Sequence, residues 1–235
     1  HSEKMMAAID NEDLPQANIE LNEALKKDSV EMLMELGEVL LSIGFLEEAK
    51  SVYETLTKRL TEEKESFLLP LIEIEIENNQ IEKAFEMLET IAPTSEYYPQ
   101  ALLITADLYQ ILGIPEVSEA KLKEAQQLLP GEPLIEFALA ELYFSNQQWK
   151  EAYEHYQTLL AANTKEMIGV SIIERIGTLL SMSGSFEEAI PYLEAALEEK
   201  ETADALFQLA FVNLQLHEHE KAIESLEKVR QLDPE

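Results

Sequence analysis

The sequence predicts an all-helical protein built from about seven copies of one two-helix unit. Three observations predict this fold class. A helical apolar pattern recurs about every 34 residues, small residues stand at a fixed distance before each pattern, and turn-forming residues lie between the two. The hydrophobic fraction of 46% is ordinary for a globular chain, so the repeated units can bury a core.

The most regular feature is a small residue that recurs at spacings of 32 to 37 residues. These residues are Ala17, Ala49, Ala84, Ser118, Ala152, Ala189 and Ala222, here called the anchor residues. A bulky side chain follows each anchor after four residues, and an apolar one follows after seven. Because offsets of 0, 4 and 7 lie on one helical face, each anchor is expected in an amphipathic helix.

A second helix is predicted before each anchor. Twelve residues upstream stand Met5, Gly37, Ile72, Ala106, Ala140, Gly177 and Ala210, most of them small enough to let another helix approach closely. Five residues upstream, Gly44, Asn79, Gly113 and Gly184 suit a helix C-terminus. Ser185 with Glu188 then forms a capping box that starts the next helix. Each unit is therefore two helices joined by a tight turn.

Some units depart from the pattern. In the unit that begins at Glu65, Pro70 lies inside the first helix and Glu75 replaces a bulky apolar residue. The alternation over 72–76 is typical of a strand, but the downstream helical register favours a helix. Glu136 breaks the apolar pattern of another first helix, and Pro191 is expected to remove one hydrogen bond from a second helix.

A 34-residue helix–turn–helix unit with these small, aromatic, alanine and proline positions resembles the tetratricopeptide repeat. Gly37, Leu40, Ala49 and Tyr53 carry the resemblance in one unit, and the closing prolines Pro130 and Pro234 carry it in two others. The resemblance implies an all-α, right-handed superhelical solenoid. The units of this single array over 1–235 are approximately 1–29, 30–64, 65–98, 99–132, 133–169, 170–202 and 203–235.

The resemblance also implies a concave groove lined by the first helices, and hence a non-catalytic protein–protein interaction scaffold. The family's groove positions fall on Met34, Glu38, Leu41, Leu69, Glu73, Ile76, Leu103, Asp107, Gln110, Phe137, Glu141, Phe144, Phe207 and Phe211. Family members that clamp a C-terminal carboxylate use Lys, Arg and Asn at these positions. Acids and aliphatics here are expected to repel such a ligand.

One groove position is acidic in four consecutive units, as Glu38, Glu73, Asp107 and Glu141, here called the four acidic positions. Aligned carboxylates flanked by apolar side chains would select a protein or peptide that carries Lys or Arg between apolar anchors. Alternatively, a chain with 47 acidic residues places acids on every solvated face. Both interpretations stay open at the level of sequence.

The charge balance disfavours other classes of partner. With 17 basic and 47 acidic residues, the formal net charge is −30. Binding to nucleic acid or to an anionic membrane needs a basic face, so neither is expected. No uncharged apolar run approaches the roughly 20 residues that span a bilayer. Together with the absence of cysteine, this predicts a cytoplasmic protein.

Few residues have the spacing that catalysis or metal binding requires. Consecutive glutamates such as Glu47 and Glu48 lack the pocket that separates the pKa values of catalytic carboxylates. His217 and His219, two residues apart near a turn, are expected to point their rings apart. Trp149 is expected in the core. No enzymatic activity, metal or cofactor is therefore predicted.

The ends of the array suggest an alternative function. The first helix is incomplete at His1, and no solvating helix follows Pro234. Because an uncapped end exposes an apolar flank, we expect either a fragment of a longer array or a homo-oligomer formed through terminal repeats. In the second case the chain would be a self-assembling structural module.

Overall fold

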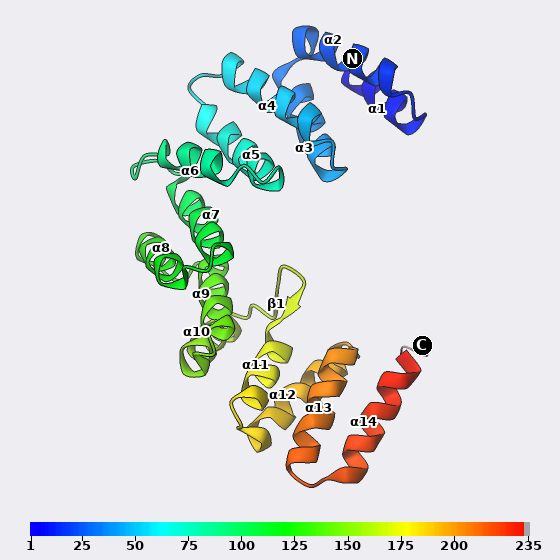
Figure 1. The fold of residues 1–235 in the computed structure, drawn as a ribbon, viewed down its shortest axis with the longest axis vertical. Helices are drawn as coiled ribbons and strands as arrows, with labels where there is room; N and C mark the ends of the chain where they lie inside the picture. Colours follow the sequence, from blue (N-terminus) through cyan, green and yellow to red (C-terminus); the bar gives the residue numbers. More distant parts are fainter. Residues whose placement is uncertain (233–235) are drawn as a thin grey trace. The chain divides into compact units, whose positions relative to one another are not determined.

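The computed structural model describes residues 1–232 and confirms the all-helical class (Figure 1). Pro234 lies outside the described residues. The helices follow one another as consecutive pairs: α1 (Ser2–Asp10) and α2 (Leu14–Lys27), α3 (Val30–Ser42) and α4 (Leu46–Arg59), α5 (Lys64–Glu77) and α6 (Ile81–Glu89), α7 (Tyr98–Ile111) and α8 (Pro115–Leu128), α9 (Pro133–Ser145) and α10 (Trp149–Ala161), α11 (Ile172–Met182) and α12 (Phe186–Glu199), and α13 (Ala203–Gln215) and α14 (His219–Leu232). None of these helices is long and apolar enough to cross a membrane.

The described chain divides into two compact units, His1–Ala101 and a second that begins at Leu102. The first holds the helices α1 to α6, and the second holds α8 to α14, with the boundary inside α7. Within the second unit, α11, α12, α13 and α14 pack in sequence order (Figure 1). The prediction of a single array over 1–235, with the boundaries given above, stays a prediction.

The anchor residues lie in the core, as predicted. All seven are almost fully buried within the second helix of their pair. Gly37, twelve residues before Ala49, shows why the first helix also needs small residues. A Cβ atom added at Gly37 would lie 3.0 Å from the ring of Tyr53 on α4. A side chain at this position would therefore require the Tyr53 ring to shift by a few tenths of an ångström.

The turn inside every pair contains one residue in the left-handed backbone region. It stands five residues before the anchor and is Glu12, Gly44, Asn79, Gly113, Gln147, Gly184 or His217, with φ between 57° and 84°. Glycine adopts this conformation without strain, and asparagine tolerates it better than most residues. The tight turn predicted from three glycines and one asparagine is thus common to all seven pairs.

The two helices with a proline in their interior are continuous. Pro70 lies inside α5 and Pro191 inside α12. The 72–76 segment, whose alternation suggested a strand, is part of α5. Helical register over the whole unit therefore outweighed a local pattern of period two.

A short antiparallel hairpin, β1 (Glu166–Met167) with β2 (Val170–Ser171), was not predicted. It lies in the connection between α10 and α11. Its two-residue turn, Ile168 and Gly169, has positive φ at both positions. Such a turn matches the right-handed twist of paired strands.

Trp149 is less buried than predicted. It is the first residue of α10 and is half-buried rather than enclosed by the core. Its ring packs edge-on against Phe144, with ring centroids 5.6 Å apart.

Glu75 departs from the apolar pattern and is 2% exposed. Its carboxylate accepts from Lys50 of α4 at 2.7 Å and from Lys83 of α6 at 2.8 Å. Burial raises the pKa of Glu75, but the two lysines outweigh burial, and the pKa falls below its ordinary value. The acid is therefore charged and joins three consecutive helices.

Glu136 is also buried, and its carboxylate too has polar partners on neighbouring helices. One carboxylate oxygen accepts from Gln126 Nε2 at 2.8 Å, and the other lies 2.6 Å from Nδ1 of His155. The His155 ring in turn stacks on Tyr143, with centroids 5.5 Å apart. A polar residue at an apolar repeat position thus has partners on both neighbouring helices.

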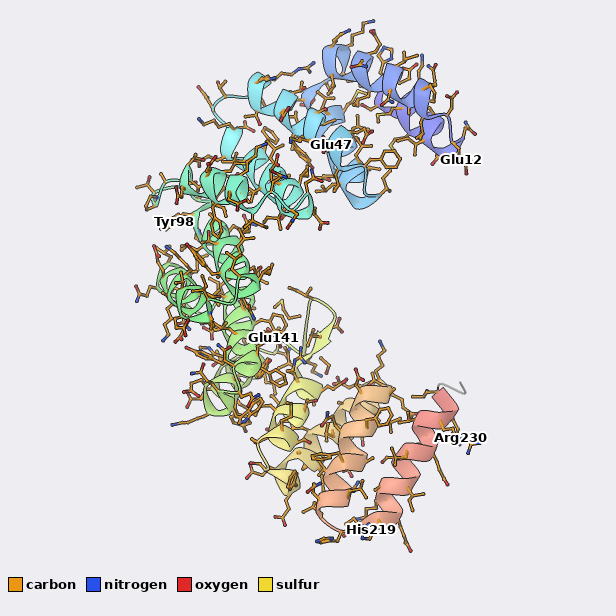
Figure 2. All side chains as sticks on the ribbon, viewed as in Figure 1. Glu12, Glu47, Tyr98, Glu141, His219 and Arg230 are labelled. Carbon is orange, nitrogen blue, oxygen red and sulfur yellow. The ribbon has the colours of Figure 1, made fainter. Side chains whose placement is uncertain are left out.

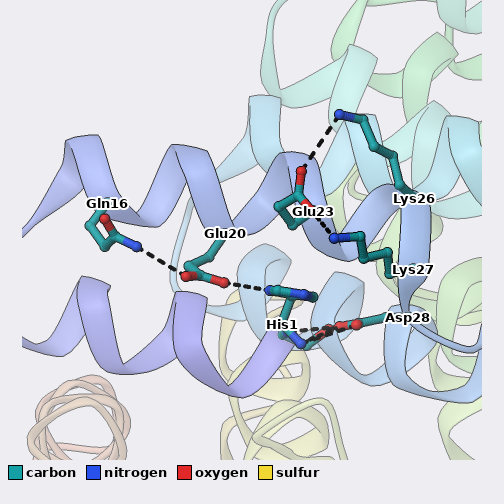
Figure 3. Close-up of polar contacts among 8 residues, drawn as sticks. His1, Gln16, Glu20, Glu23, Lys26, Lys27 and Asp28 are labelled. Carbon is teal, nitrogen blue, oxygen red and sulfur yellow. Dashed lines mark hydrogen bonds and ion pairs between the residues drawn. The ribbon is translucent and has the colours of Figure 1, made fainter.

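Asp28, directly after α2, holds the start of the first unit together (Figure 3). Ser2 donates to it from the backbone N–H at 2.6 Å and from Oγ at 2.7 Å, and the His1 amino group is 3.0 Å away. Burial raises the pKa of Asp28, but these hydrogen bonds outweigh burial, and the pKa falls below its ordinary value. Arg59 of α4 donates to the backbone oxygens of Asp28 and Leu25 at 2.7 and 2.6 Å, so α1, α2 and α4 are linked.

Among the anchor residues, Ser118 should contribute least to the stability of the fold. Its side chain is 0% exposed, and its hydroxyl has no hydrogen-bond partner within the part of the chain that the structure describes. Because an unpaired buried hydroxyl costs about 1–2 kcal/mol, Ser118→Ala should raise the free energy of unfolding by roughly 1 kcal/mol. Urea unfolding followed by circular dichroism measures the change. The reverse exchange at an equivalent anchor, Ala152→Ser, should destabilise by a similar amount, and a destabilised Ser118→Ala would contradict the explanation.

Glu75→Gln should destabilise the first unit by about 2–3 kcal/mol at pH 7, because it leaves two lysine charges without their acid. The folded pKa of Glu75 is depressed, so its stabilisation is complete above the unfolded pKa and is lost as the pH falls below about 4.5. The difference in unfolding free energy between wild type and variant should therefore shrink between pH 7 and pH 3. Glu62→Gln, in the exposed α4–α5 connection, is the control and should alter neither stability nor pH dependence.

Candidate functional site

The four acidic positions follow directly after the residue that stands twelve positions before the anchor, which is small in three of these units and is Ile72 in the other. Glu38 lies on α3 and Glu73 on α5, both in the first unit, whereas Asp107 on α7 and Glu141 on α9 belong to the second. That preceding residue is buried, and the next residue is rotated by about 100° around the helix. This rotation brings Glu38, Glu73 and Asp107 to the exposed surface, whereas Glu141 is half-buried.

In the first unit, the negative charges of Glu38 and Glu73 both affect the pKa of Tyr53 on α4. Burial, followed by the negative charges of Glu38 and Glu73, raises the pKa of the Tyr53 hydroxyl to about 12. Glu73 is solvent-accessible, yet partial desolvation by the surrounding protein and the nearby Glu77 raise its pKa. No cation within residues 1–232 pairs with Glu38 or Glu73. This part of the surface therefore carries two negative charges without internal compensation.

In the second unit, Glu141, which is labelled in Figure 2, is already paired. Its two oxygens accept from Nε and Nη2 of Arg175 on α11 at 2.9 and 2.8 Å, and Tyr156 of α10 donates to it at 2.5 Å. The guanidinium also lies 4.8 Å from the centre of the Phe144 ring. Burial and the bonded Glu141 raise the pKa of Tyr156 above its ordinary value. Glu141 thus binds a residue of its own chain.

Arg175 and Tyr156 are absent from the predicted groove set. Arg175 stands two residues before Gly177 in the unit that follows Glu141, and Tyr156 stands four residues after its anchor. Both residues could have been found by checking, for each of the four acidic positions, which residue stands at the Tyr156 position of the same unit and which stands at the Arg175 position of the next unit. The sequence pattern ranked positions within one unit and so missed a partner 34 residues away.

Asp107 is exposed on α7, yet partial desolvation by the surrounding protein raises the pKa of its carboxyl. Of the apolar groove positions, Met34, Phe207 and Phe211 are exposed. Leu41, Ile76, Leu103, Gln110 and Phe144 are half-buried. Phe211 packs edge-on against Phe186, with centroids 6.0 Å apart. Met34 and Glu38 are thus both exposed on α3, whereas α13 exposes the two aromatic residues; that these positions form a docking face stays a prediction.

Leu69 and Phe137 correct the predicted groove set, because both side chains are buried. Their helices, α5 and α9, pack against the second helix of the preceding pair, α4 and α8. Burying a large apolar side chain stabilises the fold by about 1.5–3 kcal/mol, which explains why these positions are enclosed. Leu69 and Phe137 contribute to the core and not to a contact surface.

The two neighbouring histidines also differ from prediction. The rings of His217 and His219 lie edge to face with centroids 6.1 Å apart, rather than pointing apart. The reason is that His217 is the left-handed turn residue of its pair and only His219 is helical. Among the residues described, no group of three or more His, Cys, Asp or Glu side chains is placed to hold a metal ion.

Comparison with known families and proteins agrees with the repeat pattern. A profile of tetratricopeptide repeat protein 21 ARM repeats matches residues 3–111, one of YpiA-like tetratricopeptide repeats matches 110–164, and a general tetratricopeptide repeat profile matches 175–235. The TPR repeat-containing protein YpiA of Bacillus subtilis is 36% identical over 221 residues. The match covers 94% of this chain, and the chain spans half the length of that relative.

Solved structures of low sequence identity share the fold. PilF of Pseudomonas aeruginosa has a TM-score of 0.69 at 16% identity, over 91% of this chain and 94% of that one. A chain of the APC/C hetero-tetramer Cut9–Hcn1 has a TM-score of 0.66 at 16% identity, over 91% of this chain and 42% of that one. The repeated anchors, the seven left-handed turns and these matches lead to one conclusion: the chain belongs to the tetratricopeptide repeat family.

Proposed function

We propose that this chain is a non-catalytic scaffold whose first-helix face docks protein segments that carry basic and apolar residues. The fold is typical of protein-interaction scaffolds. The observation that carries the finer proposal is the pair Glu38 and Glu73 in the first unit. Both are exposed carboxylates without an internal cation, and they lie on helices that also present Met34, Leu41 and Ile76.

Charge supports the same class of partner. A net charge of −30 attracts a cationic segment over distances up to the Debye length, about 8 Å at physiological salt, and repels polyanions. The acidic face would set orientation and association rate, whereas the apolar side chains would hold the bound segment by burial. The similar Cut9 chain forms a hetero-tetramer with Hcn1, so an array of this fold can serve in a protein assembly.

A peptide-display library selected on the purified chain tests this proposal. Peptides selected at low salt should be enriched in Arg or Lys next to apolar residues, and their binding should weaken as salt rises. The double variant Glu38→Lys/Glu73→Lys should abolish binding because it reverses the charge at the site. Glu54→Lys/Glu82→Lys changes net charge equally on exposed faces of α4 and α6 and should retain binding. Equal loss in both variants, or selection of acidic peptides, would refute the docking proposal.

Self-association is a second candidate, favoured by one feature of α14. The residue four positions after the anchor is buried in the other six pairs, but Leu226 is 39% exposed at this position. Ile223 and Leu232 are exposed on the same helix. An apolar face of this kind suits a homotypic contact between copies of the chain.

Light scattering over a concentration series separates the two candidates. If α14 mediates assembly, the apparent mass of the wild type should rise with concentration, and Ile223→Glu/Leu226→Glu should remain monomeric because charge opposes burial. Ile19→Glu, which replaces an equally exposed apolar residue on α2, should assemble like the wild type. A wild type that stays monomeric throughout would rule this candidate out.

A further inference from the structure

The second unit shows how this repeat binds a guanidinium group. Glu141 accepts two parallel hydrogen bonds from Arg175, at 2.9 and 2.8 Å, in the bidentate geometry that arginine forms with carboxylates. The Tyr156 hydroxyl donates to the same carboxylate at 2.5 Å and fixes its orientation. The Phe144 ring covers the guanidinium from 4.8 Å. Acid, tyrosine and apolar cover therefore form a complete arginine site.

The first unit repeats this arrangement without its arginine. Glu38 and Tyr53 occupy the repeat positions of Glu141 and Tyr156. The position of Arg175 is taken by Pro70, which has no charge. Leu41 stands at the position of Phe144 and is half-buried, so it can supply apolar cover.

The Glu38 site is more negative than the Glu141 site, as a site for a cationic ligand should be. Thr178, which follows Gly177 in the second unit, has Glu73 as its counterpart in the first. The Glu141 site contains one acid and one base and is neutral as a group. The site formed by Glu38, Glu73 and Tyr53 carries two negative charges, and no cation among residues 1–232 pairs with either acid. A cation from outside would supply what Arg175 supplies in the second unit.

The Tyr53 hydroxyl is open to a group from outside. The Tyr53 residue is 4% exposed, its hydroxyl makes no hydrogen bond within the described residues, and the hydroxyl oxygen is not one of their fully buried unpaired atoms. It lies over Gly37, 3.2 Å from where a Cβ atom would stand, and is therefore next to Glu38. It can therefore bond to a ligand atom, whereas the equivalent Tyr156 hydroxyl already donates to Glu141.

We propose that the site formed by Glu38, Glu73 and Tyr53 binds the guanidinium group of an arginine side chain on a protein partner. This inference rests on the proposed docking function and specifies the residue that the docking face recognises. The bound guanidinium would form a bidentate pair with Glu38, as Arg175 does with Glu141, and would compensate Glu73. Glu38 would then be positioned to accept from Tyr53.

Arginine fits this site better than lysine. A planar guanidinium presents five donors and can engage two carboxylates at once, whereas an ammonium group is a compact and more strongly hydrated charge. Leu41, beside the site, favours the less hydrated cation. The internal example in the second unit is an arginine.

Titration of the chain with Nα-acetyl-arginine amide tests the proposal, with the tyrosine ring signals observed by NMR and assigned with Tyr53→Phe. The Tyr53 signal should shift and saturate. Nα-acetyl-lysine amide should bind about tenfold more weakly, the difference of one charge-assisted hydrogen bond. The uncharged citrulline analogue should leave Tyr53 unshifted. Equal responses to the three compounds, or none to arginine, would overturn the proposal.

Two variants of the first unit sharpen the test. Glu38→Gln/Glu73→Gln keeps side-chain size and should weaken arginine binding at least about tenfold. Pro70→Arg places an arginine at the position of Arg175 and should fill the site from within, so that added arginine no longer shifts Tyr53. Pro70→Leu also removes the proline from α5 but adds no charge, and it should bind arginine like the wild type. Arginine binding that survives Pro70→Arg would count against the proposed geometry.

The reciprocal change in the second unit is a further check. Arg175→Gln should open the Glu141 site and produce a second arginine response, at Tyr156, while circular dichroism confirms that the helices remain. The two levels of the proposal fail separately. If the library yields salt-sensitive peptides but arginine leaves Tyr53 unshifted, the arginine site is wrong and docking stands. If Tyr53 responds but no peptide is selected, the site stands and the docking function is wrong.

Discussion

The fold depends on one contact that every helix pair repeats, the burial of a small anchor residue where the second helix meets the first. All seven anchors are almost fully buried, so this position is enclosed in each pair. Gly37 and Tyr53 show how little space there is in one pair, since an added Cβ atom would lie 3.0 Å from the ring. The close approach fixes which residue of the first helix comes next to the second helix. It therefore also fixes that the following residue, one of the four acidic positions in four units, turns toward the surface.

Polar residues that interrupt the apolar pattern are tolerated because neighbouring helices supply their partners. Glu75 takes lysines from α4 and α6, and Glu136 takes Gln126 and His155 from α8 and α10. In a solenoid each pair contacts only its neighbours, so such bonds couple adjacent pairs more directly than apolar packing does. Ser118 is the exception, a polar anchor without a partner. The difference shows that burial of a polar group here is a matter of available donors and acceptors and not of position alone.

What recurs in all seven units could be predicted from the sequence, and what occurs once could not. The anchors, the turns and the helical state of the 72–76 segment follow from a register shared by several copies. The β1–β2 hairpin belongs to one connection, and its only sequence signal is the widest anchor spacing, 37 residues between Ala152 and Ala189. Leu69 and Phe137 lie in register with exposed residues, but packing against the preceding pair buries them. Arg175 escaped prediction because its partner is in another unit, so no pattern inside one unit contains the bond.

This last point bears on how an acidic repeat surface acquires specificity. In a chain with 47 acidic residues, the presence of a carboxylate says little about its use. Whether the chain itself supplies the matching cation is more informative. Glu141 pairs with Arg175 and so stabilises the contact between α9, α10 and α11, whereas Glu38 and Glu73 have no cation partner among residues 1–232. In the proposed arginine site, the same repeat position would serve recognition in one pair and folding in another, and the residue at the position of Pro70 and Arg175 would decide which.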